Sequence, residues 1–168
     1  VKYRNETRQA SATMSTLDTA NIAQLVLKLG LVNEAQLQEV FDQIGKNAEP
    51  QKLLFALERK SFLTPYQTSK LIKGDTDGYF LGGYRMLYKI ASGSFGRVYR
   101  ADDPRSGRIV AVKVLRRRWS EDQQKIDLFN REGKVGMTLQ HPNIVEIVNV
   151  GQDPASGAYF IVMEFVEG

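Results

Sequence analysis

The chain has 168 residues, of which 42% are hydrophobic and 25% charged, and its formal net charge is +4. These values suit a globular protein of one or two small domains, and the mild charge argues against general nucleic-acid binding. The sequence has no apolar run of about 18 residues that would span a membrane, no cysteine for disulfides or thiolate metal sites, and one histidine, which argues against a histidine metal centre.

The first half of the chain is predicted to be helical. Residues 1–16 contain no apolar core and are expected to form a disordered tail. From 17 to 73, apolar residues recur at the spacing of amphipathic helices, which predicts four short helices. The first begins after a cap at Asp18 and stops at Gly30, and the third carries Pro50 at an early position, where no N–H is needed.

These helices form an internal repeat. The segment LVNEAQLQEVF at 31–41 aligns with FLTPYQTSKLI at 62–72, at an offset of 31 residues. In each copy a polar cap is followed three positions later by Gln, which is the capping-box pattern. The two pairs are Asn33 with Gln36 and Thr64 with Gln67. We therefore predict two helix–turn–helix units packed as one four-helix module, with a structural or docking role.

The second half is predicted to be mainly extended. Residues 74–83 are expected to be a linker. Beyond them, five short runs rich in Val, Ile, Tyr and Phe predict strands, with DPRSGR at 103–108 as a hairpin turn. One helix is expected at 121–140, capped by Ser120. The predicted class is α+β, with a five-stranded antiparallel sheet and one helix after the helical bundle.

A glycine-containing loop lies between the first two expected strands. In SGSFGRV, Gly93 and Gly96 are spaced to let backbone amides approach a polyphosphate. The loop turns a hairpin and opens no helix, which separates it from a Walker A loop and from a dinucleotide-binding fingerprint. The alternative is that the glycines serve turn geometry alone.

Two charged residues can support phosphate binding. Lys113 lies among valines in VAVK. Burial of its ammonium is costly unless an anion lies beside it. The alternative is that Lys113 is a surface lysine whose charged end reaches water. Glu132 lies in the expected helix and can pair with it. His141, in HPNIV, is expected to be structural, and the run Arg116–Arg118 is expected to be a solvated segment.

Together these motifs resemble a known family. The glycine hairpin, VAVK, Arg-Glu in a helix, HPNIV and YFIVMEFVEG follow in the order of the N-terminal lobe of a eukaryotic-type Ser/Thr protein kinase, most similar to bacterial members. The resemblance covers residues 84–168. It implies a parent protein that transfers the γ-phosphate of ATP to protein Ser or Thr, with Mg ligands only in a second lobe. The H-R-D and D-F-G motifs of that lobe are absent, so these 168 residues are expected to be inactive alone.

The resemblance assigns roles residue by residue. Lys113 contacts the phosphates and Glu132 pairs with it, Met163 is the gatekeeper, and residues 164–166 form the hinge. Ala91 replaces the first glycine of the loop, and only modest weakening is expected. The full implied ATP-contacting set is Ile90, Ala91, Ser92, Gly93, Ser94, Phe95, Gly96, Val98, Ala111, Lys113, Met163, Glu164 and Val166.

Further expectations concern flexibility and partners. Gly133 and Gly136 each cost roughly 1 kcal/mol in a helix interior, which predicts a mobile helix. Exposed apolar residues are expected to favour self-association. They are Met137, Leu139, Phe165 and Val166. A cytoplasmic location is expected, although the parent can carry an anchor beyond this chain. The alternative function is a non-catalytic kinase-like module that acts through its helices and docks a protein partner.

Overall fold

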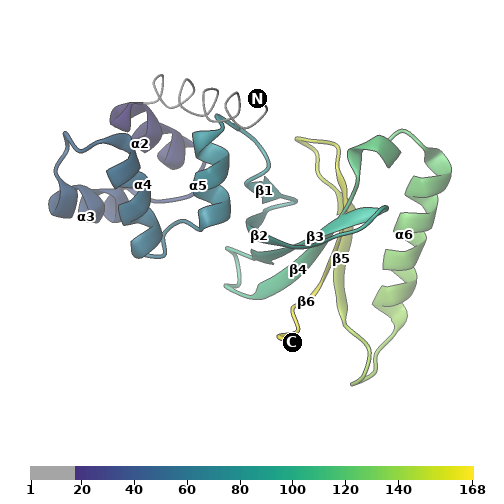
Figure 1. Cartoon of the computed structure of the whole chain (residues 1–168). Coiled ribbons are helices and arrows are strands. Elements are labelled where there is room, and N and C mark those ends of the chain that lie inside the picture. The colour runs from purple at the N-terminus through teal and green to yellow at the C-terminus, as the bar shows by residue number, and fades with distance from the viewer. Residues whose placement is uncertain (1–17) are drawn as a thin grey trace, which may run out of the picture. The chain divides into compact units, whose positions relative to one another are not determined.

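The computed structural model describes residues 18–168, so the expected tail at 1–16 lies outside the described residues. The chain divides into two compact units, Val1–Tyr79 and Phe80–Gly168. Within the described residues, the first unit is helical, whereas the second contains a sheet and one long helix (Figure 1). The α+β class is confirmed.

The first unit contains four described helices, as the sequence predicts. They are α2 (Thr19–Lys28), α3 (Glu34–Ile44), α4 (Pro50–Arg59) and α5 (Pro65–Ile72). Asp18 caps α2 through its side chain, and Pro50 lies at the start of α4. The side chains on their facing surfaces form a shared core, which includes Val26, Val40, Leu53 and Leu57. Each helix is too short to be stable alone, so this shared core holds the module together.

The 31-residue repeat extends to individual hydrogen bonds. Both predicted capping boxes form, at the starts of α3 and α5. After α2, the N–H of Leu31 donates to the carbonyl of Val26 at 3.0 Å, and after α4 the N–H of Phe62 donates to Leu57 at the same distance. These are the bonds of a Schellman C-cap, which requires a left-handed residue. Gly30 and Ser61 occupy that position, with φ of 70° and 59°.

The second unit is built on a six-stranded antiparallel sheet in the order β1-β2-β3-β4-β6-β5. The strands are β1 (Phe80–Leu81), β2 (Tyr84–Ser92), β3 (Gly96–Asp102), β4 (Ile109–Leu115), β5 (Ile147–Gln152) and β6 (Tyr159–Glu164). The prediction of five strands was therefore wrong by one. The additional strand, β1, lies inside the segment 74–83 that the sequence favoured as a linker. A two-residue turn with positive φ at Gly82 and Gly83 joins it to β2.

Two hairpins of the sheet use the same turn. Asp103 accepts a hydrogen bond from the Ser106 hydroxyl at 3.2 Å, and Asp153 accepts one from the Ser156 hydroxyl at 2.7 Å. Asp153 is buried and also accepts from the N–H of Gly82 at 3.0 Å, so it ties the β5–β6 turn to the β1–β2 turn. Sequence inspection predicted the first hairpin turn and missed the second.

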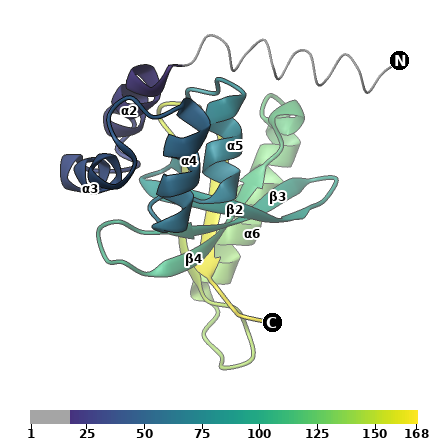
Figure 2. The ribbon, with the colours of Figure 1, turned by 60° about the vertical axis from the view of Figure 1, so that its left-hand side comes forward.

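The long helix α6 (Gln123–Thr138) lies along one face of the sheet (Figures 1 and 2). It begins later than predicted, because Asp122, not Ser120, caps it by accepting from the N–H of Lys125. The preceding residues form a short 3-10 turn, Arg117–Trp119. The core beneath α6 consists of Leu115, Ile126, Phe129 and Ile161.

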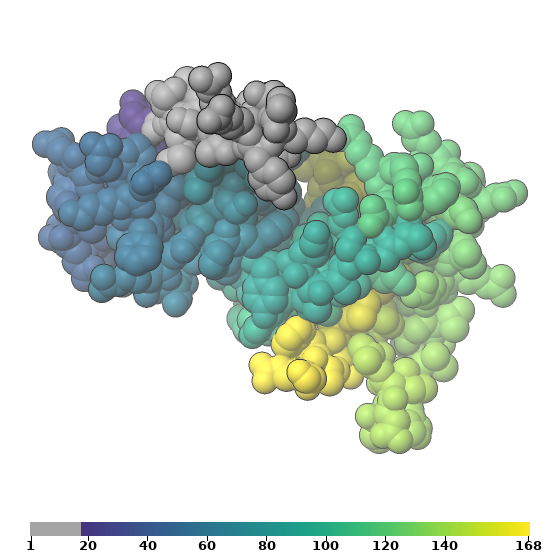
Figure 3. All heavy atoms as spheres, in the orientation of Figure 1, coloured from purple at the N-terminus to yellow at the C-terminus, as the bar shows by residue number. Residues whose placement is uncertain are grey.

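The two helix glycines have a packing reason. A Cβ atom at Gly133 would lie 2.6 Å from a methyl carbon of Val150, and one at Gly136 would lie 2.5 Å from Cγ1 of Ile147. Both neighbours belong to β5, so the glycines allow α6 to approach that strand closely. Beyond this contact, the exposed residues 137–146 form a protrusion at one end of the unit, visible in Figure 3.

Candidate functional site

Strand pairing brings five of the predicted site residues onto one face of the sheet. Val98 on β3 lies directly opposite Ala91 on β2 and opposite Lys113 on β4. Ala111 on β4 lies opposite Met163 on β6. Opposed residues in an antiparallel sheet project to the same side, and so do residues two apart on one strand. These five side chains therefore share the face on which α6 packs.

An ion pair joins β4 to α6 on this face. The ammonium of Lys113 donates to a carboxylate oxygen of Glu132 at 2.8 Å. The Lys113 side chain is 24% exposed and that of Glu132 is 55% exposed, so the lysine is only partly buried. An ion pair with this much solvent contact adds little to stability, about 0–1 kcal/mol. Its significance is positional, because it holds the ammonium between α6 and β4, the strand that pairs with β3 directly after the glycine loop.

The glycine loop closes as a tight hairpin between β2 and β3. The N–H of Gly93 donates to the carbonyl of Gly96 at 2.9 Å, across the loop tip. Gly96 requires the absence of a side chain, because a Cβ there would lie 2.9 Å from the carbonyl oxygen of Val114. Ala91 lies within β2 in paired, extended backbone, where no glycine is needed. Ile90 and Ser92 flank it on the same strand and are exposed.

Residues after β4 hold the loop from one side. Arg116 donates from Nε to the carbonyl of Gly93 at 2.6 Å and from Nη2 to the hydroxyl of Ser92 at 2.9 Å. The carbonyl of Ser94 accepts from Nη2 of Arg118 at 2.7 Å and from Nε1 of Trp119 at 3.1 Å. The expectation of a merely solvated Arg116–Arg118 segment is thus corrected. Sequence inspection missed these contacts because they join residues 23 to 25 positions apart.

These contacts orient the loop amides. In a trans peptide, the carbonyl of one residue and the N–H of the next point in opposite directions. The carbonyls of Gly93 and Ser94 face the arginine side, so the N–H groups of Ser94 and Phe95 face away from it. Adjacent N–H groups that point the same way in a turn can form a concave site for an anion.

Phe95, at the loop tip, packs inward. The ring centroids of Phe95 and of Phe129 on α6 lie 6.3 Å apart. The ammonium of Lys125, also on α6, lies 5.9 Å from the centroid of the Phe95 ring. The loop tip is therefore attached to the same helix that carries Glu132. The position of α6 and the position of the loop depend on each other.

The predicted hinge, residues 164–166, begins at the last residue of β6. The N–H of Glu164 donates to the carbonyl of Glu146 at 2.9 Å, and its carboxylate accepts from the N–H of Glu146 at 3.0 Å. Regular structure ends at Glu164, and Val166 is 62% exposed. The ring of Phe165 is half-buried beneath the guanidinium of Arg100, at 4.7 Å. The sequence predicted that the side chains of Phe165 and Val166 are both exposed. This prediction is correct for Val166 and wrong for Phe165.

Within residues 18–168, no three or more His, Asp or Glu side chains gather in a way that could hold a metal ion. Nor does any helix of the described part have the length and apolar character needed to cross a membrane.

Comparison with known proteins identifies the second unit. Residues 84–168 match the protein kinase domain family. The chain is 41% identical over 87 residues to the serine/threonine-protein kinase PrkC of Bacillus subtilis and 39% identical over 90 residues to PknA of Mycobacterium tuberculosis. Each alignment covers 52% of this chain, but only 13% of PrkC and 21% of PknA.

A solved structure is also similar. The PknI kinase domain of Mycobacterium tuberculosis aligns with 29% identity and a TM-score of 0.46, over 53% of this chain and 35% of that one. The chain spans about a fifth or less of the length of the curated relatives named above. Through residues 84–168, the chain belongs to the protein kinase domain family.

Proposed function

We propose that residues 84–168 form the ATP-binding lobe of a bacterial Ser/Thr protein kinase. The parent protein transfers the γ-phosphate of ATP to Ser or Thr hydroxyls of a protein substrate. The observation that carries this proposal is the Lys113–Glu132 ion pair at 2.8 Å, next to a loop whose amides are oriented together.

The residues present suit a polyphosphate. The N–H groups of Ser94 and Phe95 are donors for phosphate oxygens, and the Lys113 ammonium supplies a compensating positive charge. Glu132 keeps that ammonium in place before nucleotide arrives, so less ordering is required on binding. Gly93 and Gly96 let backbone come close to the phosphates.

The same sheet face suits an adenine ring. Val98 and Ala111 present small apolar groups beside the phosphate region, and Met163 lies opposite Ala111 in the register. A flat base needs such an apolar surface together with a few backbone hydrogen bonds at its edge. The backbone of Glu164, the last residue of β6, and of Val166 beyond it supplies that edge in our proposal.

ATP supplies the phosphoryl group, and this unit contributes binding and orientation. In kinases the Asp that orients the substrate hydroxyl and the groups that hold Mg lie outside this lobe. We therefore expect the 168 residues to bind nucleotide weakly and not to transfer phosphate by themselves.

Calorimetric titration of the 168-residue chain with ATP tests the proposal. We expect a dissociation constant in the range of roughly 0.1–1 mM, weakened at least about tenfold in Lys113→Ala. Lys134→Ala, an exposed lysine on α6, is the control and should leave the affinity unchanged. Equal affinity in Lys113→Ala and the wild type would remove the support for this site.

A further inference from the structure

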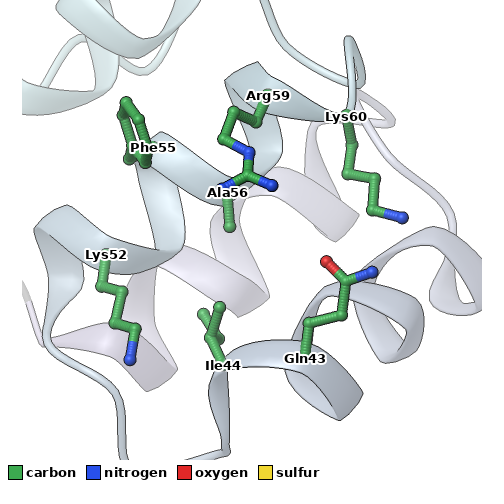
Figure 4. A pocket seen from close by; sticks show the side chains of 7 residues that line it. All are labelled: Gln43, Ile44, Lys52, Phe55, Ala56, Arg59 and Lys60. Atoms are coloured by element: carbon green, nitrogen blue, oxygen red, sulfur yellow. The ribbon is translucent and has the colours of Figure 1, made fainter.

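A second candidate site lies wholly within the helical unit, where α3 and α4 leave a cavity of about 610 Å³ between them. Figure 4 shows Lys52, Phe55, Ala56 and Arg59 along α4, with Ile44 at the end of α3 facing them. The α4 residues are spaced i, i+3, i+4 and i+7, so they form one helix face. The opposite face of α4 contributes Leu53, Leu54 and Leu57 to the core.

The chemistry of the cavity is both apolar and cationic. Its apolar wall consists of Ile44, Ala56 and Phe55, and Phe55 is 61% exposed. No other large hydrophobic side chain is as exposed in residues 18–79. Apolar side chains grouped at a cavity and rimmed by polar residues are typical of an interaction surface. The packing of the module itself does not use it.

The charges around that ring are positive. Lys52, Arg59 and Lys60 line the cavity, and no acidic residue does. Lys60 is held at 2.5 Å by Glu39, but neither Lys52 nor Arg59 has an ion-pair partner among the described residues. Two cations beside an apolar wall are complementary to an acidic segment that also carries an apolar side chain.

Charge also narrows the choice of occupant. Residues 1–17 of the chain carry Lys2, Arg4 and Arg8 against Glu6, so their charge has the same sign as the cavity. Residues 18–79 contain seven Lys and Arg and eight Asp and Glu, a net charge of −1. A nucleic-acid-binding unit normally carries a broad basic excess. Here the unit has no basic excess, although three of its seven basic residues line one cavity.

We propose that this cavity binds an acidic segment of a partner protein, anchored by one apolar side chain. The anchor lies against Phe55, Ala56 and Ile44. Carboxylates on either side of it pair with Lys52 and Arg59. The helical unit would then dock the kinase to a partner or substrate, separately from the ATP-binding lobe.

Fluorescence polarisation with labelled synthetic peptides tests the proposal on the 168-residue chain. The probes are 12-residue peptides of Asp, Glu and Ser with one central Leu or Phe, the same peptides with Ser at the centre, and Lys-containing counterparts. We expect the anchored acidic peptides to bind with a dissociation constant below about 1 mM, weakening severalfold when salt rises from about 0.05 to 0.5 M. The basic peptides should not bind.

Matched variants separate the two parts of the site. Lys52→Glu combined with Arg59→Glu should weaken binding of the acidic peptides at least tenfold. Phe55→Ser should remove the preference for the anchored peptide over its Ser-centred form. Lys73→Glu, an exposed lysine that does not line the cavity, should change neither. All four positions are exposed, and an unchanged melting temperature verifies that each variant is folded.

Three outcomes would overturn the proposal. One is that no anchored acidic peptide binds. Another is that Lys52→Glu combined with Arg59→Glu leaves the affinity for the acidic peptides unchanged. The third is that a single-stranded oligonucleotide binds more tightly than the peptides and is lost in the same variants, which would make the cavity a nucleic-acid site. ATP affinity, measured in parallel, should be unchanged by these variants, so a failure here is distinguishable from a failure of the proposed kinase site.

Discussion

Gly133 offers a direct test of how α6 is positioned. On helix propensity alone, Gly133→Ala should stabilise the helix by about 1 kcal/mol. The structure predicts otherwise, because the new Cβ would lie 2.6 Å from Cγ2 of Val150 and 3.0 Å from Cγ1 of Ile161. Overpacking of this kind costs typically about 1–3 kcal/mol. We therefore expect a net loss of roughly 0–2 kcal/mol in the free energy of unfolding.

The assay is urea unfolding followed by tryptophan fluorescence. Trp119 is the single tryptophan of the chain and packs against the core beneath α6, so its signal reports the second unit. A double-mutant cycle with Val150→Ala isolates the part of the steric cost that comes from Val150. Because that change removes both Val150 methyl groups and leaves only the 3.0 Å approach to Ile161, Gly133→Ala should be less destabilising in its background, with a coupling energy of about 1–2 kcal/mol.

The neighbouring position Lys134 provides a reference for the helix propensity of alanine relative to glycine. Lys134 is exposed on the same helix turn, so the difference between Lys134→Ala and Lys134→Gly measures alanine against glycine without a packing contribution. If Gly133→Ala stabilised the wild type by as much as the measured difference between Lys134→Ala and Lys134→Gly, Gly133 would not be packed closely against β5. The same conclusion would follow if Gly133→Ala changed the free energy of unfolding equally in the wild type and in Val150→Ala.

Three other predictions concern the loop, the turn and the exposed apolar residues. Arg116→Ala combined with Arg118→Ala should weaken ATP binding about three- to tenfold in calorimetry, since the loop carbonyls lose their donors, whereas Arg117→Ala should not. Burial alone would raise the pKa of Asp153, but hydrogen bonds from Ser156 and the N–H of Gly82 hold that pKa below its usual range. The stability it contributes is therefore present above about pH 4 and is lost as the pH falls through the lowered value. Asp153→Asn should thus reduce the melting temperature at pH 7. Below pH 4, the difference in melting temperature between this variant and the wild type should be smaller. We also expect concentration-dependent self-association in sedimentation, reduced by Met137→Ser with Leu139→Ser, and a monomer at high concentration would contradict it.

Much of the molecule could be predicted from the sequence, because its signals are local. Both capping boxes involve residues three positions apart, and the helix starts at Asp18 and Pro50 follow from the same short-range chemistry. The glycine hairpin, the VAVK strand and the order of motifs that indicates a kinase lobe are likewise local patterns. Hydrogen bonds and backbone angles within one turn depend little on the rest of the chain.

Other features depend on contacts between distant residues, and only the tertiary structure decided them. The short strand β1 contains two residues, too few for a periodic pattern, and exists because it pairs with β2. Gly133 and Gly136 suggested a mobile helix, yet both face β5 at distances that leave no room for a methyl group. Arg116 and Arg118 had the pattern of a solvated run, and the folded sheet places them beside the loop carbonyls. In each case the residue type was visible in the sequence, but its partner was set by strand order and helix packing, which no local pattern encodes.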